Sequence, residues 1–226
     1  MPLTHIAIIP DGNRRWAKEN KVSTLIAYKI STDYKKAQAI CEEAKKQGAK
    51  YLSIWGFSTE NWKRSKKEIR EIFKIIKRSL DSLEKDSKKN KYRFICLGRR
   101  DRIPKDILKK IETLEKETKD YDKFNIIFCI DYGGRDEIVR AVKKIIREDI
   151  KEINEKSFAK YLDTKEIPDP DLVIRTAGEK RLSGFMPFQT AYSEFYFTKT
   201  LFPAFGVKEL REAIRDFKER KRNFGE

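Results

Sequence analysis

The sequence alternates short apolar, β-branched runs with longer segments of helical period, and this alternation constrains the fold more than any other feature. We predict strands at residues 5–9, 51–57, 92–97, 124–130, 172–175 and 194–197. We predict helices at residues 29–47, 66–88, 105–118, 134–148, 155–162 and 208–221. The second helix is the clearest, because Ile69, Ile72, Phe73, Ile76 and Leu80 recur at three- and four-residue steps and form one apolar stripe.

Strands separated by helices of this length favour right-handed crossovers and a parallel sheet. The chain of 226 residues is long enough for one substantial core, and no repeat, linker or low-complexity block divides it. We therefore predict an α/β fold with a single domain over residues 1–226. Its central, mostly parallel six-stranded sheet is covered on both faces and flanked by helices. Ligands in such sheets bind beyond the carboxyl ends of the strands, so the segments that follow strands are the candidate site.

The three cysteines and the single histidine narrow the available chemistry. Cys41, Cys96 and Cys129 form no CxxC pair, so we predict buried, reduced thiols and neither a metal site nor a disulfide. His5 is the only histidine, which excludes a histidine-rich metal site and a serine–histidine–aspartate triad outside the first strand. Carboxylates, amides, hydroxyls and arginines remain.

Charge and hydropathy bear on location and partners. No segment approaches the roughly 20 apolar residues that cross a bilayer, and the N-terminus lacks a signal pattern, so we expect a cytoplasmic protein. The net charge of +16 suits nucleic acid, anionic lipid or small polyanionic substrates. The basic runs at 63–67, 88–91 and 218–222 also fit solvated helix faces, because acidic residues are interspersed through most of the chain.

The first predicted strand runs into a polar and cationic segment. A glycine there allows a tight turn close to a ligand, and arginine forks suit phosphate oxygens. An aspartate at the strand tip is placed to hold Mg²⁺ against the same phosphates. An ordinary Asp-Gly turn with exposed arginines fits the segment equally well. The candidates are Asp11, Gly12, Asn13, Arg14, Arg15 and Trp16.

A second polar segment follows the second strand. Its hydroxyls are donors to anions, its asparagine is placed to relay or orient a proton, its tryptophan offers a flat apolar wall and its arginine suits phosphate. The competing interpretation is a helix N-cap at one of the hydroxyl residues, with the glutamate exposed. The candidates are Ser58, Thr59, Glu60, Asn61, Trp62 and Arg64.

The fifth strand leads into a loop bracketed by glycines. It carries a second set of hydrogen-bond donors to an anion, Arg175, Arg181 and Ser183. Glu194 begins the apolar sixth strand, and a metal role would explain a carboxylate there. We expect both sets of hydrogen-bond donors and the carboxylates of Asp11 and Glu194 at one edge of the sheet.

These segments resemble the cis-prenyltransferase family, whose best-known member is undecaprenyl diphosphate synthase. The motifs are DGNRRW at 11–16, FSTENW at 57–62, DYGGR at 131–135, DLVIRT at 171–176, RLS at 181–183 and YSEFYF at 192–197. Together they span nearly the whole chain. The resemblance implies a prenyltransferase that joins an allylic prenyl diphosphate to isopentenyl diphosphate with Mg²⁺, releases diphosphate and forms a cis alkene.

The resemblance also implies residue roles. Asp11 and Glu194 would hold Mg²⁺, Asn61 would handle the proton, and an apolar tunnel between the sheet and the helices at 29–47 and 66–88 would house the growing chain. The donor diphosphate would lie on residues 12–15, with Trp16 completing that motif. Substrate contacts would come from Ser58, Thr59, Glu60, Trp62 and Arg64, and the acceptor diphosphate would bind at Arg175, Arg181, Leu182 and Ser183.

The chain departs from the family pattern at the donor site. Thr24 stands where the family has an arginine, Ala27 and Tyr28 replace a glycine–histidine pair, and Ser31 replaces a glycine. Ala204 also replaces a common aspartate. Three interpretations follow: a chain-elongating enzyme, an irregular or short-chain enzyme that uses another acceptor such as dimethylallyl diphosphate, and an accessory subunit of a heteromeric enzyme. Tyr28 or Lys29 would compensate in part for the missing donor contacts.

The resemblance further implies a homodimer in which residues 222–225 cross towards the partner's site. The basic surface favours peripheral contact with an anionic membrane. A nucleic-acid-binding module is the rival from another class, but the chain has no recognisable RNA- or DNA-binding motif, and that reading leaves Asp11 and Glu194 without a role. We therefore expect no nucleic-acid partner.

Overall fold

The computed structural model describes residues 2–220, and within them the chain forms one six-stranded sheet in which every strand is parallel to its neighbours. The sheet order is β3-β4-β2-β1-β5-β6. The strands are β1 (His5–Ile9), β2 (Tyr51–Ser58), β3 (Tyr92–Leu97), β4 (Phe124–Tyr132), β5 (Leu172–Arg175) and β6 (Glu194–Phe197). All six predicted strands are confirmed, with β2 and β4 extending one and two residues further.

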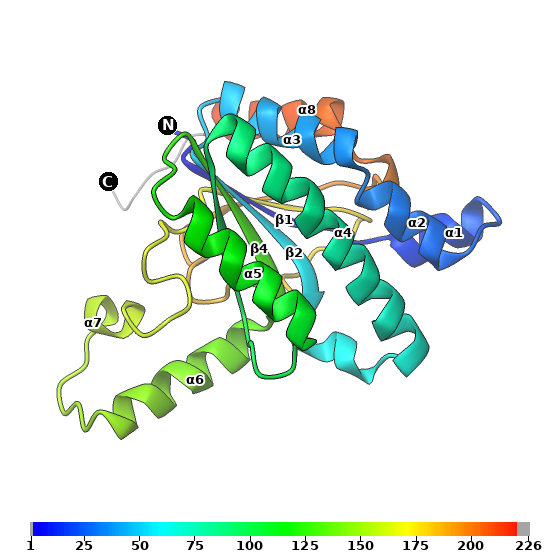
Figure 1. Cartoon of the computed structure of the whole chain (residues 1–226). Coiled ribbons are helices and arrows are strands. Elements are labelled where there is room, and N and C mark those ends of the chain that lie inside the picture. Colours follow the sequence, from blue (N-terminus) through cyan, green and yellow to red (C-terminus); the bar gives the residue numbers. More distant parts are fainter. Residues whose placement is uncertain (1, 221–226) are drawn as a thin grey trace.

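Helices connect these strands in the expected alternation (Figure 1). They are α1 (Asn13–Glu19), α2 (Thr24–Ser31), α3 (Tyr34–Lys46), α4 (Lys66–Asn90), α5 (Lys105–Thr118), α6 (Gly134–Arg147), α7 (Glu155–Ala159) and α8 (Val207–Glu219), with short 3₁₀ turns η1 (Thr59–Lys63) and η2 (Phe202–Ala204). The single helix predicted at 29–47 is wrong. Two helices, α2 and α3, replace it, because Asp33 caps a new N-terminus by accepting the Lys36 N–H at 3.0 Å.

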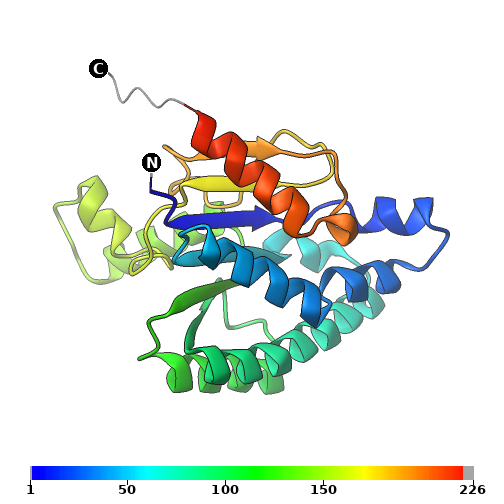
Figure 2. The same cartoon turned by 90° about the horizontal axis from the view of Figure 1, so that it is seen from above.

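The two faces of the sheet are covered differently. Helices α3, α4, α5 and α8 pack on one face, where Ile8, Ile126 and Phe128 lie among the core residues (Figure 2). On the other face, Ala7, Ile127 and Val173 pack against Phe185 and Met186 from the irregular segment that follows β5. The second face is therefore covered largely by non-helical chain. The cysteines Cys41, Cys96 and Cys129 are buried and free, as predicted.

A distortion of β2 shapes the carboxyl edge of the sheet. The pairing of β2 with β4 shifts register between Trp55 and Phe57 and again before Ser58. Such β-bulges re-aim the side chains that follow them. Ser58 thus ends β2 directly beside η1, at the edge where β1 and β5 also end.

Candidate active site

Asp11 lies just beyond the end of β1 and is fixed by the loop that follows β5. Its backbone N–H donates to Thr176 Oγ1 at 2.7 Å, and Gly12 N–H donates to its carboxylate Oδ1 at 2.7 Å. Gly12 has φ +97°, and a Cβ there would lie 2.8 Å from Leu201 Cδ2 and 2.9 Å from Ala177 Cβ. The Asp-Gly turn therefore requires glycine, both for its backbone conformation and for its close packing.

Arg175, the last residue of β5, connects the first predicted segment, at Asp11, with the second predicted anion site, at Arg181 and Ser183. Its side chain is only 5% exposed, and its Nη2 donates to Asp11 Oδ2 at 2.8 Å. Nη1 donates to Ser183 Oγ at 2.8 Å and to the carbonyl of Arg181. The Nε atom is buried and has no hydrogen-bond partner among the described residues. A buried cationic N–H without a partner is rare and is suited to an anionic ligand.

The turn η1 carries the second predicted segment to the same edge. Ser58 N–H donates to Asn61 Oδ1 at 3.2 Å, which fixes the asparagine amide. Thr59 donates to Glu60 at 3.1 Å. Among these four residues, Ser58, Glu60 and Asn61 line the cavity described below, and Thr59 does not.

Trp62 turns away from the cavity into the core. Its Nε1 donates to Asp131 Oδ1 at 2.8 Å, and its ring packs on Phe57 and Phe73. Asp131 is fully buried and also accepts from Arg102, at 2.9 Å for Nε. This contact explains part of the DYGGR motif, because Asp131 anchors the turn that carries Asn61.

The arginines of the first motif have different partners. Arg14 reaches across to Glu68 of α4 at 2.8 Å. Arg15 donates to the carbonyl of Ala177 at 3.0 Å and pairs with Glu179 at 3.0 Å. Arg181 also pairs with Glu179, at 2.6 Å, and these two contacts lower the pKa of the Glu179 carboxyl, Arg181 having the larger effect.

Trp16 and Leu182 do not line the cavity. Trp16 lies in α1, where its carbonyl accepts from the Asn20 side chain at 2.9 Å. Leu182 packs against the core on the face of the sheet that lacks the long helices. Arg181 is likewise absent from the cavity lining, and its carbonyl holds Arg175.

Glu194 lies at the opposite end of the sheet from Asp11, and our expectation of a shared edge is wrong. Glu194 pairs with Leu172 at the start of β5, three residues before Arg175, which corresponds to roughly 10 Å along the strand. Its carboxylate binds Arg220 at 2.7 Å. Within one chain, Glu194 and Asp11 therefore do not share a metal ion.

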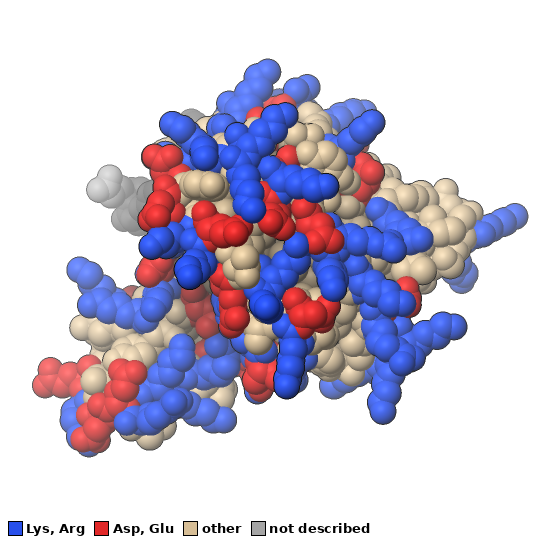
Figure 3. Space-filling model, viewed as in Figure 1, with Lys and Arg blue, Asp and Glu red and all other residues tan. Residues whose placement is uncertain are grey.

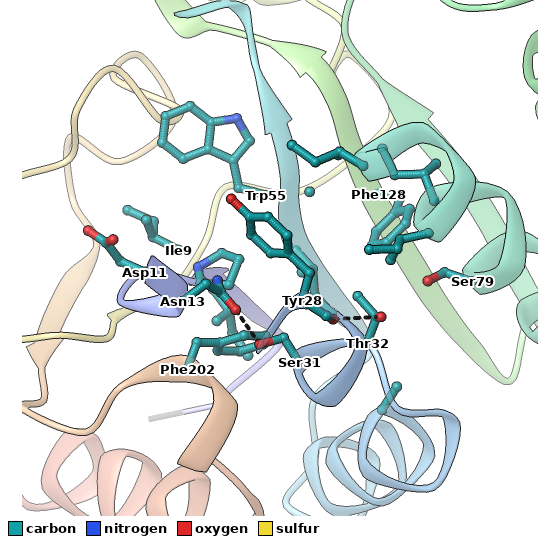
Figure 4. Close-up of a pocket in the computed structure, with 18 of the residues that line it drawn as sticks. Ile9, Asp11, Asn13, Tyr28, Ser31, Thr32, Trp55, Ser79, Phe128 and Phe202 are labelled. Atoms are coloured by element: carbon teal, nitrogen blue, oxygen red, sulfur yellow. Dashed lines mark hydrogen bonds between the residues drawn. The ribbon is translucent and has the colours of Figure 1, made fainter. Parts of the chain in front are cut away.

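A cavity of about 630 Å³ opens at Asp11 and runs between the sheet and helices α2, α3 and α4. Its mouth is polar and cationic, with Asp11, Asn13, Arg14, Arg64 and Arg175. Its interior is mainly apolar. Figure 4 shows Asp11 and Asn13 on one side of the cavity, Phe128 and Ser79 on the other, and Tyr28 between them. The apolar interior is lined by Ile8, Ile40, Ile54, Ile72, Ile75, Ile76, Leu83, Ile126 and Phe128.

Two of the residues that depart from the family pattern, Tyr28 and Ser31, lie at this mouth. Tyr28 lines the cavity, and its hydroxyl accepts from Arg64 Nη1 at 2.7 Å. Ser31 donates to the Asn13 side chain (Figure 4). Thr24 begins α2, and Ala27 is fully buried. Tyr28 therefore provides a polar group beside a predicted phosphate-binding arginine.

The residues of the mouth fit a magnesium ion that a substrate phosphate helps to hold. In residues 2–220 no group of three or more acidic, histidine or cysteine side chains is arranged to hold a metal ion. Mg²⁺ usually keeps several waters and binds one or two carboxylates together with substrate phosphates. The Asp11 carboxylate, 40% exposed beside three arginines that suit phosphate, matches that donor set.

Glu68 is a site residue that the motifs did not reveal, whereas Tyr28 was expected to compensate in part for the missing donor contacts. The available signal for Glu68 was its spacing, because it lies four residues after Arg64 on the first turn of a helix. Asp131 belongs to the DYGGR motif, but the motif did not reveal its contact with Trp62. That contact forms because β2 and β4, which are distant in sequence, lie side by side.

A parallel sheet with arginines and the Asp11 carboxylate at its carboxyl edge, above a mainly apolar cavity, defines a protein that binds a phosphorylated ligand with a hydrocarbon part. Residues 9–225 match the family model described as "Putative undecaprenyl diphosphate synthase". The chain belongs to this family of prenyl diphosphate synthases and is a prenyltransferase.

Individual relatives cover the chain almost completely. The chain is 43% identical to an isoprenyl transferase of Aquifex pyrophilus and 42% identical to one of Fusobacterium nucleatum, each alignment covering 98% of this chain and 95% of the relative. The crystal structure of lavandulyl diphosphate synthase from Lavandula x intermedia in complex with dimethylallyl diphosphate is similar with a TM-score of 0.93 and 33% identity. That alignment covers 99% of this chain and 98% of the other.

Proposed function

We propose that this protein is a magnesium-dependent cis-prenyltransferase that condenses an allylic prenyl diphosphate with isopentenyl diphosphate. The observation that carries the proposal is the cavity, whose arginine-rich mouth at the carboxyl edge of the sheet continues into a mainly apolar interior of suitable size for a prenyl chain. Asp11, Gly12, Asn13, Arg14, Arg15 and Arg64 would hold the donor diphosphate and its Mg²⁺.

The charges at the mouth account for the chemistry. Breaking the allylic carbon–oxygen bond leaves negative charge on the departing diphosphate, and Arg14, Arg15 and Arg64 would stabilise that charge as it develops. Bound Mg²⁺ would supply further electrostatic stabilisation of the leaving group. Arg175 and Ser183 would position the acceptor diphosphate so that the acceptor's double bond forms a carbon–carbon bond to the allylic cation. The Asn61 amide would orient the proton that then leaves to the released diphosphate as the new alkene forms. The apolar walls would exclude water from the allylic cation.

A second candidate is an irregular condensation in which dimethylallyl diphosphate is the acceptor. The similarity to lavandulyl diphosphate synthase, solved with dimethylallyl diphosphate, favours this candidate. So do Tyr28 and Ser31, because they change contacts at the mouth of the cavity.

One assay tests both candidates and the accessory-subunit interpretation. Purified protein is incubated with short and long allylic donors against isopentenyl and dimethylallyl diphosphate, with Mg²⁺ or with a chelator, and products are identified by mass. We expect Mg²⁺-dependent chain products from isopentenyl diphosphate, and none from folded Asp11→Ala protein. A product made only from dimethylallyl diphosphate would establish the irregular reaction. Absence of product with every pair would reject an autonomous enzyme.

We also propose a homodimer that uses the exposed apolar side of α6. Val139 is 51% exposed and Ile146 is 70% exposed on a helix that projects from the body of the molecule (Figure 1). A second copy would cover these side chains, and sedimentation velocity measures the assembly. The segment 222–225, which the resemblance places near the partner's site, lies outside the described residues.

Peripheral contact with an anionic membrane is a further part of the proposal. Helices of residues 2–220 include none with the length and apolar character of a membrane span. Figure 3 shows lysine and arginine side chains spread over the face formed by α3, α4 and α5, with acidic side chains between them. Binding to anionic liposomes that weakens at high salt is expected. Equal partition to neutral liposomes would reject this contact.

A further inference from the structure

Three helices and the residue that follows η1 meet at one carboxylate beside the mouth of the cavity. Glu68, on the first turn of α4, accepts from Arg14 of α1, whose Nη2 lies 2.8 Å from both carboxylate oxygens. Arg64, which follows η1, has its Nη1 3.3 Å from Glu68 Oε1. The Tyr28 hydroxyl of α2 donates to the same oxygen at 3.3 Å.

The two arginines face the cavity, whereas the carboxylate that binds them does not. Arg14, Arg64 and Tyr28 belong to the cavity lining, and Glu68 is absent from it. Glu68 is half-buried, with 25% of its side chain exposed. Burial opposes ionisation, but the hydrogen bond and charge of Arg14, the charge of Arg64 and the hydrogen bond of Tyr28 outweigh it and lower the pKa of the Glu68 carboxyl. A charged carboxylate therefore engages two cations at the cavity mouth.

A carboxylate and a diphosphate bind the same N–H groups of these arginines. Both bind guanidinium groups through charge-assisted hydrogen bonds, so each N–H given to Glu68 is withheld from a phosphate oxygen. Arg14 donates to both Glu68 oxygens through a single nitrogen. A donor diphosphate that binds this arginine must either displace Glu68 or share its charge.

We propose that Glu68 is an affinity-determining residue that competes with the donor diphosphate for Arg14 and Arg64. This inference rests on the proposed function. The competition weakens binding of the donor and of the diphosphate that the reaction releases, and it thereby favours product departure. Glu68 acts through the arginines and is not assigned a contact with the reacting atoms.

Glu68→Gln removes the negative charge and preserves the size of the side chain. The helix N-terminus stays capped, because its contact uses the backbone N–H of residue 68, which donates to Ser65 Oγ at 3.2 Å. Arg14 is 61% exposed, so the ion pair is weak. We expect the variant to bind inorganic pyrophosphate about two- to fivefold more tightly in calorimetry, the range for exposed ion pairs.

Glu71→Gln is the matched control. Glu71 lies on the same helix and pairs with Lys74 at 2.8 Å, outside the cavity lining. The control should bind pyrophosphate as the unchanged protein does, which separates a local competition from a general loss of negative charge. The KM for the allylic donor should fall in Glu68→Gln and stay constant in Glu71→Gln.

The outcomes separate this inference from the proposed function. If the unchanged protein binds pyrophosphate and turns over, and Glu68→Gln binds pyrophosphate equally or more weakly with its fold intact by circular dichroism, Glu68 supports the arginines and the competition is refuted. If both variants bind more tightly by the same factor, the effect is general charge and the inference also fails. An unchanged protein that neither binds pyrophosphate nor turns over would reject the proposed function itself.

Discussion

Substituting Arg175 by lysine and by methionine separates the contribution of its charge from that of its guanidinium fork. The fork spans Asp11 on one side and Ser183 on the other, at 2.8 Å each. A lysine ammonium is a point charge on a flexible stem, so it cannot keep both contacts in the same geometry. Methionine fills a similar volume without charge.

The contacts of Arg175 determine how large the losses in kcat/KM and in stability should be. One charge-assisted hydrogen bond contributes about 1.5–3 kcal/mol, or about 10- to 150-fold in kcat/KM. Arg175→Met should lose at least that factor, and Arg175→Lys should lose about three- to tenfold because the charge remains. Stability should change by only about 1–2 kcal/mol in Arg175→Met, since water can solvate Asp11, which is 40% exposed.

Steady-state kinetics with each substrate varied in turn is the assay. The loss should appear mainly in kcat/KM for the acceptor, and the KM for the allylic donor should change less, because Arg175 reaches the donor site only through its contact with Asp11. Urea unfolding checks the fold of each variant. A methionine variant that retains wild-type kcat/KM for the acceptor would refute the assignment of Arg175.

Three further predictions concern the anchoring of η1, the pH dependence of stability and the product. Asp131→Ala should lower the free energy of unfolding by about 2–3 kcal/mol in urea titration, because Trp62 Nε1 and Arg102 lose a buried acceptor; this figure is reduced from that for a fully buried pair because Arg102 is 37% exposed. Burial lowers the pKa of His5 in the folded protein to about 4 from 6.5. Between pH 4 and pH 6.5, His5 is therefore protonated in the unfolded chain and neutral in the folded protein. Stability should therefore fall by up to about 3 kcal/mol as pH drops from 6.5 to 4, and the fall should be smaller in His5→Gln. Ile76→Trp should shorten the product measured by mass, because Ile76 lines the apolar interior; unchanged product length would remove that wall from the chain-binding surface.

The six strands were predictable because their signals are local. Each of the six apolar runs is bounded by polar or turn residues, and β1 and β5 end at the predicted residues. The break between α2 and α3 was missed because the helical periodicity continues across Asp33, while the cap that interrupts it depends on one side-chain contact. Periodicity alone does not distinguish one long helix from two short ones.

The position of a site residue was predictable where the residue lies at the end of a strand. It was predicted wrongly for Glu194, which lies at the start of one. Asp11, Ser58 and Ser183 follow strands, and the structure brings them to the cavity mouth. Glu194 is the first residue of β6, and in an all-parallel sheet the first residue of a strand lies at the amino edge. The sequence indicated this position, because Glu194 stands directly before the apolar run that begins at Phe195. The Glu68 contacts depend on the packing of α1 and α2 against α4, which no local pattern specifies.

A crystal structure with an unreactive thio-analogue of a long allylic diphosphate, together with isopentenyl diphosphate and Mg²⁺, would show whether both substrates bind side by side in this cavity. The proposal predicts the donor diphosphate at Asn13, Arg14 and Arg64, with its hydrocarbon between the sheet and α4 and the acceptor diphosphate beside Arg175. A hydrocarbon bound outside this cavity, or a cavity that admits only one of the two diphosphates, would contradict it.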